Sequence, residues 1–110
     1  MFYKHNQDGY KPVLEGIKIK TLVYGEKTLF AEFKMEKGSQ LPKHAHPQEQ
    51  TGYLVSGHIR LTFGGETFDV EPGDSWCIPA NMEHGAEIIL DTVAIEVFSP
   101  VREDYLAYKS

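Results

Sequence analysis

GSQLPKHAHPQEQTGYLVSG, residues 38–57, brings two histidines and a glutamine close together in the chain. One residue separates His44 from His46, so an extended backbone would turn both side chains toward the same face. Gln50 follows His46 by four residues, and His84 lies far downstream, at the end of GDSWCIPANMEH, residues 73–84. Imidazole is a common protein ligand for Zn, Fe, Ni and Cu. The pattern predicts one metal site formed by His44, His46, Gln50 and His84.

The composition excludes several classes of protein. The chain has 110 residues, which fits a single domain spanning residues 1–110. Its formal charge is −5 and it shows no basic stripe, which argues against nucleic acid as a partner. No run of about 18 apolar residues is present, so no membrane span is expected. The lone cysteine, Cys77, excludes an internal disulfide, and we expect a cytoplasmic protein.

Most of the sequence predicts short β-strands. Leu29–Met35 alternates apolar and polar residues with a period of two. Further strands are expected at residues 17–24, 51–56, 59–63, 67–70, 75–78, 86–90 and 92–98. Ser56-Gly57-His58 and Gly64-Gly65 predict hairpin turns, and the last two strands are expected to join near Asp91. A short helix or turn is predicted over Arg102–Tyr108. This pattern is typical of an all-β sandwich or barrel.

The first segment resembles a motif of the cupin superfamily. That motif is a Gly, five residues, His-x-His, three or four residues, a Glu, six residues and a second Gly. Gly38, the two histidines and Gly57 match it, and Gln50 stands at the Glu position. The resemblance implies a cupin double-stranded β-helix, a jelly-roll-like barrel.

Residues 73–84 resemble the second cupin motif, which is a Gly, five residues, Pro-x-Gly, two residues and a His. Gly73, Pro79 and His84 match it. Asn81 replaces the second Gly of that motif, and Asn also tolerates the left-handed backbone conformation. The two motifs together imply a divalent metal ion inside the barrel.

The ligand types allow Ni, Zn, Mn, Co or Fe. Three neutral imidazoles and the neutral amide of Gln50 would leave the full charge of a divalent ion uncancelled. Such an ion suits binding and Lewis-acid catalysis of a small anionic substrate.

A narrower resemblance lies in IEVFSPVREDYL, residues 95–106, together with HPQEQ, residues 46–50. Both resemble a small single-domain cupin family of pectin and alginate breakdown, which converts unsaturated uronates into linear keto-acids. The resemblance implies that Glu96, Phe98 and Arg102 face the metal, with Glu96 in place of the family's usual Asp. We expect Glu96 to act as general acid or base and Arg102 to clamp a substrate carboxylate. Phe98 and Tyr53 are expected to contact the substrate.

Other interpretations stay open for single residues. Arg102 would also serve as a surface ion-pair partner of Glu103 or Asp104. A lone histidine is usually structural or exposed, and we interpret His5 and His58 in this way. Trp76 and Cys77 are expected to pack in the barrel wall.

Two alternative functions remain beside an isomerase or lyase of carbohydrate metabolism. One is an Fe(II)-dependent dioxygenase of the cupin type. The other is a non-catalytic cupin that binds or senses a small ligand. A homodimer is expected in each case, because an exposed N-terminal strand offers an edge that a second copy can cover.

Overall fold

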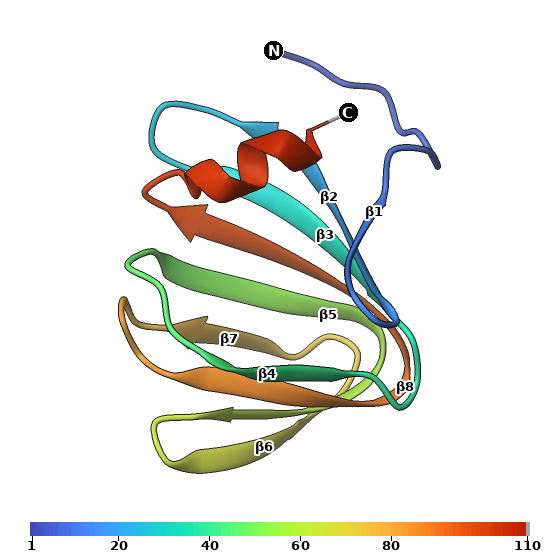
Figure 1. The fold of residues 1–110 in the computed structure, drawn as a ribbon, viewed down its shortest axis with the longest axis vertical. Coiled ribbons are helices and arrows are strands. Elements are labelled where there is room, and N and C mark those ends of the chain that lie inside the picture. Colours follow the sequence, from blue (N-terminus) through green and yellow to red (C-terminus); the bar gives the residue numbers. More distant parts are fainter. Residues whose placement is uncertain (110) are drawn as a thin grey trace.

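The computed structural model describes residues 1–109, and most of them lie in antiparallel β-strands (Figure 1). A short 3₁₀ helix, η1 (Glu103–Tyr108), follows the last strand, in the segment where the sequence predicts a helix or turn. The strands are β1 (Lys11–Leu14), β2 (Ile17–Tyr24), β3 (Leu29–Met35), β4 (Gln40–His44), β5 (Glu49–Phe63), β6 (Glu66–Val70), β7 (Ser75–Ile78) and β8 (His84–Ser99).

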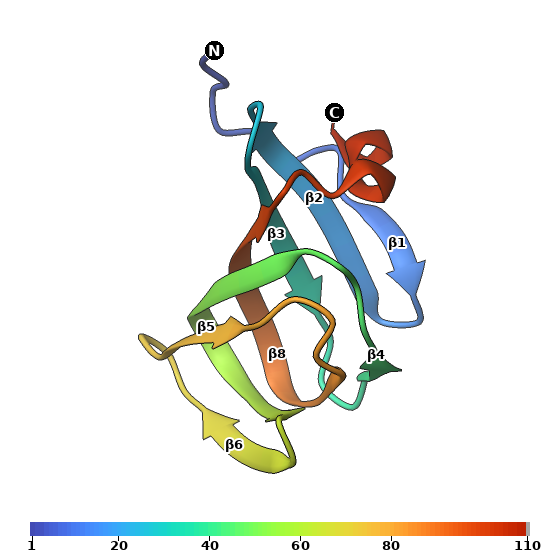
Figure 2. The same ribbon diagram turned by 90° about the vertical axis from the view of Figure 1, so that its left-hand side faces the viewer.

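Two long strands, β5 and β8, pair with each other and belong to both layers of the molecule (Figure 2). The C-terminal half of β8 pairs with β3, which continues through β2 to β1 at the edge, and the first half of β5 pairs with β7. The other halves pair with β4 and β6. The sheet therefore folds over on itself, and the expected all-β jelly-roll-like barrel is confirmed.

Gly57 marks the corner of the barrel and not a hairpin turn, so the expectation of a turn at residues 56–58 is wrong. β5 continues through this segment with register shifts between Leu54 and Ile59, and β8 likewise runs through Asp91 without a break. Gly57 has φ +96°, and a Cβ there would lie 2.2 Å from Thr92 Oγ1. A glycine with positive φ serves tight turns and bulges alike, and here it lets two strands approach closely at a bend.

Apolar side chains fill the space between the layers. The period-two alternation of β3 is confirmed, because Leu29, Ala31, Phe33 and Met35 are buried and the residues between them are partly exposed. The core also includes Ile17, Ile19, Leu54, Ile59, Leu61, Val70, Ile78, Ala86, Ile88, Ala94 and Phe98. Within residues 1–109, none of the helical structure is long and apolar enough to cross a membrane.

Candidate metal centre and active site

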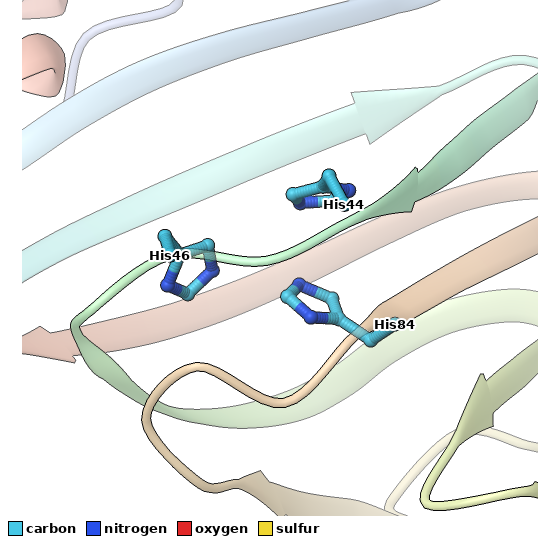
Figure 3. A group of neighbouring side chains, drawn as sticks. All are labelled: His44, His46 and His84. Atoms are coloured by element: carbon cyan, nitrogen blue, oxygen red, sulfur yellow. The ribbon is translucent and has the colours of Figure 1, made fainter.

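Strand pairing brings the three histidines together from distant parts of the chain. His44, the last residue of β4, pairs with His84, the first residue of β8. His46 lies just beyond the end of β4, in the loop before β5. The three rings face a common point (Figure 3), with ring centroids 4.2 Å apart for His44 and His84 and 4.9 Å apart for His46 and His84. His46 therefore reaches the site from a loop and not from a strand.

A backbone hydrogen bond also fixes the loop of His46. The backbone N–H of Asn81 donates to the carbonyl oxygen of His46 over 2.8 Å. Asn81 has φ +64°, the left-handed conformation that Asn tolerates, at the position where the second motif has Gly. The turn before β8 therefore holds the loop that carries His46 against the end of the barrel.

Hydrogen bonds to backbone carbonyls orient all three imidazoles in the same way. Nδ1 of His44, His46 and His84 lies 2.8, 3.0 and 2.9 Å from the carbonyl oxygens of Pro42, Gln48 and Met82, respectively. A carbonyl oxygen only accepts, so each Nδ1 carries the proton and donates it. Each neutral ring then presents the lone pair of Nε2 to the centre. Second hydrogen bonds of this kind set the tautomer of metal-binding histidines in general.

The donor atoms fit a divalent cation. Among the described residues, each of the three histidines offers a nitrogen, and these atoms all lie within 4.8 Å of one another. Nε2 of His84 is a buried nitrogen without a hydrogen-bond partner within residues 1–109. Burial lowers the pKa of His84 to about 4 and also lowers the pKa of His46, so both rings are neutral at physiological pH. A buried lone pair with no donor facing it indicates a position for a metal ion.

Gln50 adds an oxygen to this set. It lies on the inward face of β5 and is buried. Its Oε1 is 2.9 Å from Nε2 of His46, and its Nε2 donates to Oε1 of Glu96 over 2.5 Å. Because His46 already donates through Nδ1, the 2.9 Å contact brings two lone-pair donors together, as expected around a shared cation.

Glu96 lies inside the barrel, which is the position that the resemblance of residues 95–106 implies for it. Ala94, Glu96 and Phe98 are all buried on one face of the strand. Besides the bond from Gln50, Oε1 of Glu96 accepts one from Nε1 of Trp76 over 3.1 Å. Burial raises the pKa of Glu96 to about 7, although these two hydrogen bonds and the charge of Arg102 act against the shift.

Arg102 lies at the start of η1, between the cavity and the surface. Its guanidinium carbon is 3.9 Å from the ring centroid of Tyr105 and 5.2 Å from that of Phe98. Its Nε donates to Asp104 over 3.1 Å, so the ion pair expected as an alternative is present. Arg102 also lines a cavity of about 50 Å³ together with His44, Gln50, His84 and Glu96. The two interpretations of Arg102 are therefore compatible.

Comparisons with known proteins show the family and the fold of this chain. Residues 31–98 match the model of the cupin domain. The chain belongs to the cupin family. KdgF from Halomonas sp. has a similar structure, with a TM-score of 0.89 and 28% identity, over 94% of this chain and 98% of that one. An RmlC-like cupin from Shewanella frigidimarina also has a TM-score of 0.89 and 28% identity, over 94% of each chain.

A curated sequence is also similar to this cupin. It is described as polyketide synthase CurC from Streptomyces cyaneus, and it is 32% identical over 65 residues. The match covers 58% of this chain and 42% of that protein, so this cupin spans less than half of it.

Two expected positions in this cupin need correction. Tyr53 lies on the outer face of β5 and its side chain is 45% exposed, because it is an odd number of residues from Gln50 on the same strand. It therefore points away from the cavity that Gln50 lines. Cys77 is exposed and not packed in the barrel wall.

His58 lies within β5 and contacts Asp69 over 2.9 Å, and His5 is exposed, so neither histidine joins the site.

Among the cavity residues that were not predicted as site residues from the sequence, Trp76 and Tyr105 contact the predicted ones. Trp76 lines the cavity and bonds to Glu96, and Tyr105 lines it beneath Arg102. The alternation in Ser75–Ile78 is too short to assign a face to Trp76. Tyr105 follows Arg102 by three residues, which places both on one side of a 3₁₀ helix, and this spacing was the available signal.

Proposed function

We propose that this metal-binding cupin is an enzyme that opens or tautomerises an unsaturated uronate or a similar small sugar acid. The observation that carries the proposal is that a buried carboxylate, Glu96, and a guanidinium, Arg102, line the cavity that also contains His44 and His84. An acid-base group and an anion-binding group beside metal ligands are what the isomerisation of a sugar acid requires. The resemblance of residues 95–106 to cupins of pectin degradation, and the similarity to KdgF, support the same substrate class.

The reaction is an isomerisation that needs no oxidant. A proton leaves the anomeric hydroxyl, the bond between the anomeric carbon and the ring oxygen breaks, and the ring oxygen becomes that of an enolate. Carbon 4 then receives a proton, and the product is a linear keto-acid. Glu96 would take up the first proton and return it to the carbon. A divalent cation held by His44, His46, His84 and Gln50 would supply Lewis acidity at a substrate oxygen.

Arg102 would hold the carboxylate of the substrate. Its hydrogen bond to Asp104 uses Nε. The two terminal nitrogens of the guanidinium would therefore donate the two parallel hydrogen bonds to the substrate carboxylate. The cavity is small, about 50 Å³, against about 300 Å³ or more for typical small-molecule sites, so part of a sugar acid would lie at its mouth.

The direct test follows an unsaturated uronate by NMR with the metal-loaded protein. Glu96→Gln should lower kcat by about 10²- to 10⁴-fold, which is typical of a lost acid-base group. Glu87→Gln is the matched control, because Glu87 is an exposed carboxylate on the same strand. No acceleration over buffer would refute the substrate class, and full activity of Glu96→Gln would refute the role of Glu96.

Arg102→Lys tests the anion clamp separately. Lysine keeps the charge but lacks the planar fork, so KM should rise about tenfold while the free energy of unfolding changes little. An unchanged KM would show that the carboxylate binds elsewhere.

A further inference from the structure

The orientation of the Gln50 amide decides whether the site has three donors or four. Its oxygen lies 2.9 Å from Nε2 of His46. If the amide were turned over, its N–H₂ would face that same nitrogen, which has a free lone pair because Nδ1 of His46 donates to Gln48. A turned amide would donate to His46 and form a closed pair, which would withdraw two ligands from a metal.

Glu96 opposes that closed arrangement. In the observed arrangement, Nε2 of Gln50 donates to Oε1 of Glu96 over 2.5 Å. A turned amide would instead bring its own oxygen against an oxygen of Glu96, in a part of the barrel where Gln50 is 6% and Glu96 8% exposed. That oxygen of Glu96, Oε1, also accepts from Nε1 of Trp76, so it is an acceptor whether or not the carboxyl carries a proton. Two acceptors in contact away from water are costly, so Glu96 selects the amide orientation that points oxygen toward the histidines.

Trp76 in turn holds Glu96. Its Nε1 donates to the oxygen of Glu96 that accepts from Gln50, over 3.1 Å. The indole reaches this position across Gly52, which pairs with Glu96 on one side and with Trp76 on the other. A Cβ at Gly52 would lie 2.2 Å from Cε2 of Trp76, so the indole occupies the space that the missing side chain leaves.

We propose that Trp76 and Glu96 are positioning residues that hold the amide oxygen of Gln50 toward the three histidines. Glu96 thus has a structural task at the metal site in addition to the acid-base role proposed above. Trp76 acts on the metal only through Glu96 and Gln50. The chain of bonds runs from the indole N–H through one carboxylate oxygen to the amide N–H₂.

The test measures the dissociation constant of Zn²⁺ by competition with a chromophoric chelator. Residues that hydrogen-bond to metal ligands usually contribute about 10- to 100-fold to metal affinity. Glu96→Leu should therefore weaken Zn²⁺ binding by this factor, and Trp76→Phe should weaken it by less. Glu96→Gln should bind nearly as the unmodified protein does, because one amide oxygen still accepts both bonds. Tyr53→Phe, on the outer face of β5, is the matched control.

A double-mutant cycle separates positioning from general loss of structure. Trp76→Phe should weaken Zn²⁺ binding when Gln50 is present and have no effect in a Gln50→Ala background. The visible spectrum of bound Co²⁺ should change in Glu96→Leu and resemble that of Gln50→Ala. Equal effects of Trp76→Phe in both backgrounds, or full affinity in Glu96→Leu, would overturn the proposal. No sugar acid is used, so the outcome is independent of the proposed reaction.

Discussion

Replacing Gly52 by alanine should displace the only tryptophan of the chain. A Cβ at this position would lie 2.2 to 2.4 Å from three atoms of the Trp76 indole, whereas ordinary contact begins at 3.4 Å. The ring therefore has to move by about 1 Å or more, which breaks its 3.1 Å bond to Glu96. The backbone at Gly52 is not in the left-handed region, so the clash with the side chain accounts for the effect.

The expected cost has two parts. Overpacking of a filled site costs about 1–3 kcal/mol, and the lost hydrogen bond adds about 0.5–1.5 kcal/mol. Gly52→Ala should therefore lower the free energy of unfolding by about 2–4 kcal/mol. With a denaturant slope of about 2 kcal/mol per molar, this moves the urea midpoint down by about 1–2 M.

The assay is urea unfolding followed by circular dichroism, with the emission of Trp76 recorded in the folded state. The matched control is Gly25→Ala, because a Cβ at Gly25 meets no atom within 4 Å and its φ is not positive. That control should leave stability unchanged or raise it by about 0.4–1 kcal/mol. If Gly52→Ala had the emission and the midpoint of the unmodified protein, the packing argument would be wrong.

Three further outcomes follow from the same structure. A divalent metal at about 100 times its dissociation constant should add about 2.7 kcal/mol to the free energy of unfolding, and a chelator should remove this gain; an unchanged midpoint would contradict a preformed site. Phe98→Ala should cost about 3–5 kcal/mol, because the fully buried ring packs against His46 and Tyr105, and a much smaller loss of stability would show that the ring is not part of the core. In the metal-free protein, burial raises the pKa of Glu96 from 4.5 to about 7, so the folded state binds the proton more tightly than the unfolded state. The resulting stability is fully present below pH 4.5 and is lost as the pH rises through 7, a decline of about 3 kcal/mol that Glu96→Gln should abolish. Burial lowers the pKa of His84 to about 4, so its contribution to stability rises with pH, opposite to that of Glu96. This contribution is the same in the unmodified protein and in Glu96→Gln, so it cancels when their urea midpoints are compared at each pH. Parallel pH profiles of the two midpoints would refute this account.

The common direction of His44 and His46 and the alternation of buried side chains along the strands were predictable, because both depend on local periodicity. In an extended strand every second side chain shares a face, so the alternation in Leu29–Met35 and the common face of Glu96 and Phe98 follow from the sequence alone. The left-handed conformation of Asn81 agrees with its place at a glycine position of the second motif. These features require no knowledge of what lies across the barrel.

Tertiary structure decided the features that depend on partners far away in the chain. Gly57 lies at a corner because β8 passes within contact distance of it, and no local signal separates such a corner from a hairpin turn. Tyr53 lies outside because β5 turns Gln50 inward. The sequence alone predicted Gln50 as a ligand and Glu96 as an acid-base group. Their hydrogen bond, and the tryptophan that supports it, appear only when β5, β7 and β8 pair, because each bond joins residues at least 20 positions apart.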